Sequence, residues 1–276
     1  MAEPVHVKID LRHLGRLAQT GVRRAELFMG LGLNAANRPD FRDYELNKLP
    51  VAVDQASIPV RSLAPNANNE TIERYKEQFK TWVVSCGLRE LLEHYALMLD
   101  HIHKFSLAVA QMKGFLDQVG NPLKLQPAFS RLGLIQKLEL LSEHFGVGPD
   151  HPQHIASLYN ARNSLSHGFG VVRAKDADDD GKFQLRWHAI ELWAVGEETG
   201  AEFPLGELYF NPKPEPTRIQ ARFLGRSRNY SIGEKLSLSG QDLWEICYFF
   251  SMHCIPSTLR SFEEFLRKHG IEDAQS

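Results

Sequence analysis

The sequence reads Ala161-Arg162-Asn163-Ser164-Leu165-Ser166-His167-Gly168 at the end of a segment whose apolar residues recur at helical spacing. Ile155, Leu158 and Tyr159 precede this stretch and mark one buried side, so we expect a helix that ends here. A glycine after a periodic segment often takes the left-handed conformation that closes a helix, and we assign this role to Gly168. His167 then lies in the last helical turn, where the helix dipole favours positive charge.

Three polar side chains of this stretch fall close together on the helix. Asn163 and His167 are four residues apart and share a face, and the long side chain of Arg162 reaches the same edge. A guanidinium that binds anions, an amide that orients and an imidazole that titrates near neutral pH suit phosphate chemistry. Arg162, Asn163 and His167 are therefore the candidate catalytic residues. The alternative is a helix end at which Arg162 and His167 are merely solvated, or at which His167 caps carbonyl groups.

The order Arg-Asn, three residues, His-Gly resembles the RNxxxH signature of the HEPN superfamily (higher eukaryote and prokaryote nucleotide-binding domains). Members are all-helical modules, and many are metal-independent RNases that act as dimers. The resemblance implies a mainly α fold, an HEPN-like helical bundle with a β-rich insertion between the third and last core helices. The expected core helices are residues 70–119, 128–145, 150–167 and 240–268.

The resemblance also implies a function. Two protomers pair so that their motifs face one cleft, and the 2′-OH of RNA attacks the neighbouring phosphate without a metal or other cofactor. His167 acts as general acid or base, Arg162 holds the developing charge and Asn163 fixes the geometry. Such an endoribonuclease belongs in toxin–antitoxin or phage-defence systems, with an antitoxin or regulatory protein as partner. The alternatives are a non-catalytic module that binds nucleotides, RNA or proteins, and a purely structural oligomer.

Composition limits the class of protein. An apolar content of 43% and a charged content of 24% are typical of a globular protein that buries a real core. The net charge of −2 means that contacts with RNA require a local basic patch or charge from a second protomer. We expect no membrane association, because no apolar run has the length of a bilayer span. Three cysteines and no secretory leader at the N-terminus favour the cytoplasm.

The chain divides into three parts. Residues 1–69 combine a helix over 10–31, capped by Asp10 and ending near Gly30 and Gly32, with an irregular arm. Within the arm, 51–53 and 58–60 are candidate short extended pieces.

The helical domain comprises residues 70–168 plus 239–272. Its first helix has a wide apolar stripe, and we expect a bend near Gly87 or Gly114. Ser239 or Asp242 caps the last helix, and Pro256 kinks or divides it.

Residues 169–238 form the β-rich insertion, in which the apolar pattern changes to alternation. The expected strands are 183–187, 190–195, 207–210, 218–224 and 235–238. This insertion holds the densest basic and aromatic cluster of the chain, and such clusters can hold phosphates and stack on bases. A sheet edge with solvated arginines is the alternative. The candidate RNA-binding residues are Arg218, Arg222, Arg226, Arg228 and Tyr230.

Three patterns suggest metal sites, and we expect none of them to bind metal. The acidic run 176–181 begins like an EF-hand loop, but its twelfth position is Trp187 where a glutamate is required, so an acidic turn is expected instead. One helix face carries Glu90, His94 and His101, without a second Glu-x-x-His element. Two cysteines near His253, Cys247 and Cys254, lack the other ligands of a zinc site.

Overall fold

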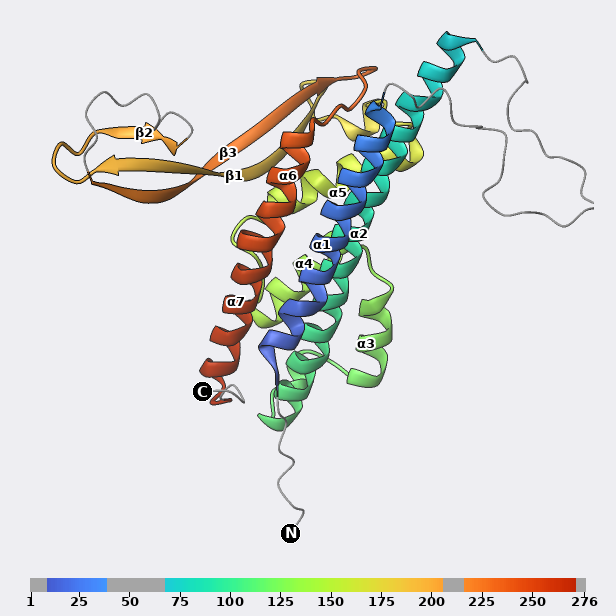
Figure 1. The fold of residues 1–276 in the computed structure, drawn as a ribbon. Coiled ribbons are helices and arrows are strands. Elements are labelled where there is room, and N and C mark those ends of the chain that lie inside the picture. The colour runs from blue at the N-terminus through green and yellow to red at the C-terminus, as the bar shows by residue number, and fades with distance from the viewer. Residues whose placement is uncertain (1–8, 39–67, 206–215, 272–276) are drawn as a thin grey trace, which may run out of the picture.

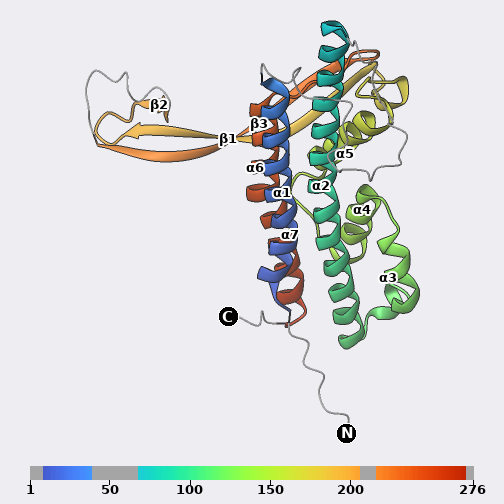
Figure 2. The same cartoon turned by 45° about the vertical axis from the view of Figure 1, so that its right-hand side comes forward.

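The computed structural model describes residues 9–38, 68–205 and 216–271, and the predicted mainly helical fold with a small β-element is confirmed at that level. The arm pieces 51–53 and 58–60 and the expected strand 207–210 lie outside the described residues. Helix α1 (Leu11–Asn37) lies along α2 (Asn69–Met112), with α6 (Gly240–Phe249) and α7 (Ile255–Lys268) beside α1 (Figures 1 and 2). The other side of α2 carries α3 (Pro122–Ser130), α4 (Leu134–Phe145) and α5 (Pro152–His167).

Glycines let α1 and α2 approach closely. A Cβ on Gly32 would lie 2.7 Å from the side chain of Val83, and one on Gly87 would lie 2.2 Å from that of Met29. The prediction that α1 ends near Gly30 and Gly32 is therefore wrong. Of the two positions where a bend was expected, Gly87 lies inside the continuous helix α2, whereas Gly114 follows the end of α2 at Met112 with a φ of 76°. These helices run through their glycines because the contact between them needs residues without side chains.

Two other helical predictions change. The expected helix 128–145 is two helices, α3 and α4, since the chain turns at Arg131–Gly133. The last helix is divided near Pro256 as predicted: a π-helical turn, η5 (Phe250–Cys254), joins α6 to α7. Ser239 caps α6, and its hydroxyl accepts a hydrogen bond from the Asp242 backbone amide at 3.1 Å.

The β-rich insertion is a long hairpin that projects from the bundle (Figure 1). Strand β1 (Lys182–Gly196) pairs antiparallel with β3 (Thr217–Ser231) over its whole length, and β2 (Glu202–Pro204) adds to the other edge of β1. The two strands expected at 183–187 and 190–195 are thus one, because inward-facing Ala189 continues the alternation. The prediction of a strand at 235–238 is wrong: in this segment Lys235 forms only an isolated bridge with Val171.

The base of the hairpin joins the helical core. Trp187 is 1% exposed, and its Nε1 donates a hydrogen bond to Glu245 on α6 at 2.9 Å. Ser157 on α5 bonds both the backbone N–H and the C=O of Arg186, so α5 covers the free edge of β1. No helix of the described ranges is long and apolar enough to cross a bilayer.

Candidate functional site

The C-terminal end of α5 holds the predicted motif, but Gly168 closes the helix differently from expectation. Its φ is −116°, so it is not left-handed; the positive φ angles belong to Phe169 (52°) and Gly170 (80°). A Cβ at Gly168 would lie 2.9 Å from the carbonyl oxygen of Ser164 and 3.0 Å from that of Val171. Gly168 is therefore required because two backbone segments meet there, and the turn itself is made one residue later.

Arg162, Asn163 and His167 line one open pocket of about 440 Å³. Arg162 Nη1 donates a hydrogen bond to Asn163 Oδ1 at 2.9 Å, and Nη2 lies 3.9 Å from a carboxylate oxygen of Glu93 on α2. His167 is exposed to solvent at the mouth. This surface is called the motif pocket, and its lining residues are Tyr159, Asn160, Arg162, Asn163, His167, Arg173, Lys175 and Asp176.

Arg173 and Lys175 are pocket residues that the sequence analysis did not identify. Arg173 is the N-cap of the short helix η3 (Ala174–Asp176), which contains Lys175 and follows a few residues after the end of α5 at His167. Asp176 accepts hydrogen bonds from the backbone N–H and Nε of Arg173 at 3.1 and 3.2 Å, and from the Ser164 hydroxyl at 3.3 Å. The signal in the sequence that could have identified Arg173 and Lys175 was their short distance along the chain from His167.

The environment of Asp176 keeps it charged. Burial alone would raise its pKa, but the hydrogen bonds from Arg173 and Ser164 outweigh burial, and the net pKa lies below its ordinary value. Asp176 therefore stays ionised and fixes η3 against α5. The predicted acidic turn is present: Asp178 accepts hydrogen bonds from the backbone amides of Asp180 and Lys182.

Exposed aromatic side chains occur on α2 and directly after the motif. Trp82 is 62% exposed and stacks on Phe79 on the same helix, and Phe169 is 85% exposed just after the motif. The hydroxyls of Ser85 on α2 and Ser166 on α5 lie 2.9 Å apart, so this part of α2 adjoins the motif.

The predicted RNA-binding residues of β3 lie elsewhere. Arg226 pairs with Glu191 at 2.6 Å and Arg228 with Asp242 at 3.0 Å. Arg222 pairs with Glu202 and lies over the ring of Trp193. Tyr230 is 6% exposed with its hydroxyl bonded to the Ser237 carbonyl, whereas Arg218 is exposed near the hairpin's outer end. All five are described residues, and the lining of the motif pocket includes none of them.

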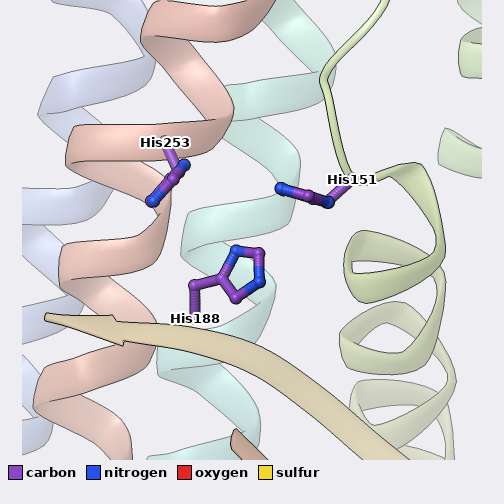
Figure 3. A group of neighbouring side chains, drawn as sticks. All are labelled: His151, His188 and His253. Atoms are coloured by element: carbon purple, nitrogen blue, oxygen red, sulfur yellow. The ribbon is translucent and has the colours of Figure 1, made fainter. Parts of the chain in front are cut away.

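A histidine cluster at the opposite end of α5 was not foreseen. His151 precedes the helix, His188 lies in β1 and His253 lies in the π-helical turn (Figure 3). One nitrogen from each lies within 4.8 Å of the others. His154 stands beside them, with its ring centroid 4.6 Å from that of His188. His151 and His154 are three residues apart in sequence, but the other members meet only through the fold.

The electrostatics at His154, His188 and His253 favour neutral imidazoles. Burial and repulsion from neighbouring histidines lower the pKa of His154 to about 4. The same causes, with burial the largest, lower the pKa of His188 and His253. The N-cap of α5 is His151, and the carboxylate of the preceding Asp150 pairs with Arg260 at 2.7 Å.

The other metal patterns do not assemble. Cys247 and Cys254 are buried among apolar side chains, and burial raises the pKa of the Cys247 thiol to about 12. His253 joins the histidine cluster instead of the cysteines. His94 bonds the Glu90 backbone carbonyl, and within the described residues the histidine cluster is the group with metal-ligand spacing.

Comparisons with protein-family models, with curated proteins and with solved structures found no match to this sequence. The resemblance to HEPN proteins therefore rests on the motif at the end of α5.

Proposed function

We propose that this protein is a metal-independent endoribonuclease of HEPN type, with the motif pocket as its active site. The observation that carries the proposal is the convergence of Arg162, Asn163 and His167 on one open pocket, together with Arg173 and Lys175. Four of these five side chains carry or accept positive charge, and a phosphodiester is the anion that such a surface attracts.

The cleavage step needs two proton transfers. The 2′-oxygen attacks phosphorus, the bond to the 5′-oxygen breaks, and the products are a 2′,3′-cyclic phosphate and a 5′-hydroxyl. One group takes the proton of the 2′-OH while another gives a proton to the leaving oxygen. Arg162, which Asn163 holds at 2.9 Å, stabilises the charge that develops on the phosphoryl oxygens.

A second protomer completes this chemistry. Among the described residues that line the motif pocket, His167 is the single imidazole, and attack and departure occur on opposite sides of phosphorus. We propose a homodimer in which the partner supplies the second histidine. The exposed rings of Trp82 and Phe169 beside the motif offer the apolar surface that such pairing would bury.

RNA outside the scissile linkage meets further cations. Exposed Arg218 is open to phosphate, whereas Arg222 and Arg226 would have to exchange Glu202 and Glu191 for it. Tyr230 would need to leave its buried position to stack on a base. The hairpin is therefore proposed to have a supporting role in RNA binding. Arg228, which pairs with Asp242, belongs to the base of the hairpin.

A second candidate function is a non-catalytic module that binds RNA or a protein partner. One contact favours it: Arg162 already pairs with Asn163 and approaches Glu93. In either case the cellular setting is proposed to be cytoplasmic toxin–antitoxin or phage defence, with an antitoxin or regulatory protein as partner. Growth separates the two, since an overproduced RNase is toxic and His167→Ala relieves that toxicity.

The direct experiment incubates purified protein with pooled cellular RNA in the presence of a chelator. Wild type and His144→Ala, which alters an exposed histidine on α4, should cleave alike, and His167→Ala should leave the RNA intact. Circular dichroism verifies that all three are folded. Equal survival of RNA with wild type and His167→Ala would refute the nuclease for these RNAs.

A further inference from the structure

The histidine cluster joins three segments that are distant in sequence. His151 stands at the start of α5, His188 in the middle of β1 and His253 in the π-helical turn between α6 and α7 (Figure 3). Ring centroids of His151 and His188 lie 4.3 Å apart, and those of His188 and His253 lie 5.2 Å apart. Phe223 packs edge-on against His253 at 3.9 Å, so one side of the cluster is apolar.

The nitrogens of this cluster are unpaired. His188 Nδ1 and His253 Nε2 are shielded from solvent and have no hydrogen-bond partner within the described residues, and the same holds for His154 Nδ1. Buried polar atoms nearly always have a partner, and an orphaned group signals an ion or ligand that satisfies it. The neighbouring carboxylate, Asp150, is engaged by Arg260 and does not satisfy these nitrogens.

We propose that His151, His188 and His253 bind one divalent transition-metal ion, for which Zn²⁺ is the best chemical match. Imidazole nitrogen is a preferred donor for zinc, and three histidines with one open position form a known tetrahedral arrangement. Three atoms within 4.8 Å of one another lie at most about 2.8 Å from a common centre. Each would move inward by about 0.7 Å to reach a zinc–nitrogen bond of about 2.0–2.1 Å.

The fourth position of the site faces either solvent or His154. The ring centroid of His154 lies 5.2 Å from that of His151, and its free Nδ1 can complete the coordination after a small rotation. A metal ion here would connect the start of α5, the hairpin and the π-helical turn. π-helical turns frequently occur at functional sites, and a metal site at His253 would explain the presence of η5 in this helix.

This inference is independent of the proposed nuclease. The cluster and the motif lie at opposite ends of α5, separated by roughly 24 Å of helical rise. A variant that loses the metal site should therefore still cleave RNA, and a variant that loses RNA cleavage should still bind the metal.

The test uses the full chain after removal of metal with a chelator and titrates it with Zn²⁺ alone. Wild type should bind one equivalent, and a hundred-fold excess over the dissociation constant should raise Tm by about 5–10 °C. His144→Gln, outside the cluster, should behave as wild type. His188→Gln and His151→Gln should lose stoichiometric binding and the rise in Tm.

Cobalt substitution keeps the test valid if a variant fails to fold. Co²⁺ bound to wild type in a tetrahedral nitrogen site shows intense visible d–d absorption, and added Zn²⁺ removes that absorption. Wild-type protein that binds no zinc, or binds it without a rise in Tm, would overturn the proposal. So would binding that His188→Gln and His151→Gln, shown to be folded, leave unchanged.

Discussion

Helix α5 has histidines at both ends, and the two ends differ in what surrounds them. At the C-terminal end His167 is exposed in an open pocket with Arg162, Arg173 and Lys175 nearby. At the N-terminal end the imidazoles are half-buried, face one another and have nitrogens without partners. The same side chain thus stands among cations and solvent in one place, and among other imidazoles and phenylalanines in the other.

The difference shows that environment assigns the chemistry of a histidine. An exposed imidazole among cations can exchange protons with solvent and with a bound phosphodiester, which suits acid–base catalysis. Clustered imidazoles that each bring one nitrogen within 4.8 Å of the others suit metal binding. The predictions below test whether the two ends are separate in this way.

The largest effects are expected from single substitutions that impair the function at one end of α5 and leave the other end unchanged. His167→Ala should lower RNA cleavage by about 10²–10⁴-fold, since it removes a proton-transfer group. Zinc binding should not change in this variant. Conversely, His188→Gln should abolish zinc binding and retain cleavage within a few-fold. Cleavage rates and zinc stoichiometry are measured on the same preparations, and a variant that loses both while folded would show that the ends are coupled.

The buried end depends on the packing of the hairpin base. Trp187 precedes His188, is 1% exposed and donates a hydrogen bond to Glu245. Trp187→Ala should lower the free energy of unfolding by about 3–5 kcal/mol, because it leaves a cavity and removes one hydrogen bond from the buried Glu245 carboxylate. Urea denaturation measures this loss. The matched control is Trp244→Ala, whose side chain is 43% exposed on α6; an equal loss for both would contradict the assignment.

The exposed end should show its charge in RNA binding. Lys175→Ala should weaken binding of RNA to the inactive His167→Ala background a few-fold and reduce the salt slope of log K by about one. Lys104→Ala, an exposed lysine on α2, is the control. Fluorescence anisotropy at several salt concentrations gives both quantities. An unchanged slope for Lys175→Ala would place the RNA elsewhere.

The smallest and most gradual effect is the dependence of stability on pH that we expect from His103. His103 is buried but paired: its Nδ1 lies 2.6 Å from Gln126 Oε1, and its ring stacks on Phe129 at 3.8 Å. Burial lowers its pKa despite the hydrogen bond that Nδ1–H donates to Gln126 Oε1. The neutral form is favoured by folding, so the stability it contributes is present above the unfolded-state pKa of about 6.5 and is lost as pH falls below it.

Urea denaturation at pH 7.5 and pH 5.5 measures this contribution. Wild type should lose more stability over this interval than His103→Gln, and exposed His144→Gln should follow wild type. Equal losses for wild type and His103→Gln would show that His103 does not titrate in this way.

Much of the helical part of the fold could be predicted from the sequence, since apolar spacing reports directly on the face that a helix buries. The errors have a common physical origin. Gly32 and Gly87 were treated as breaks, but they are contact points between α1 and α2, and sequence alone does not distinguish a glycine that turns from one that packs. Gly168 was given the left-handed conformation that Phe169 adopts.

The motif pocket was partly predictable for the same reason. Arg162, Asn163 and His167 are local, and helical geometry places them together without knowledge of the fold. The histidine cluster was not, because His188 and His253 meet His151 only when a strand and a π-helical turn dock against α5. Ion pairs on β3 were equally hidden: Arg226 meets Glu191 across the hairpin through a register that alternation alone does not specify.

The most direct measurement of the central claim compares an RNA oligonucleotide with its 2′-deoxy twin, both incubated with wild type and His167→Ala in chelator. The account predicts that wild type cleaves only the ribose form and leaves a 2′,3′-cyclic phosphate, and that His167→Ala cleaves neither. Cleavage of both twins by wild type, or an intact ribose form, would contradict it.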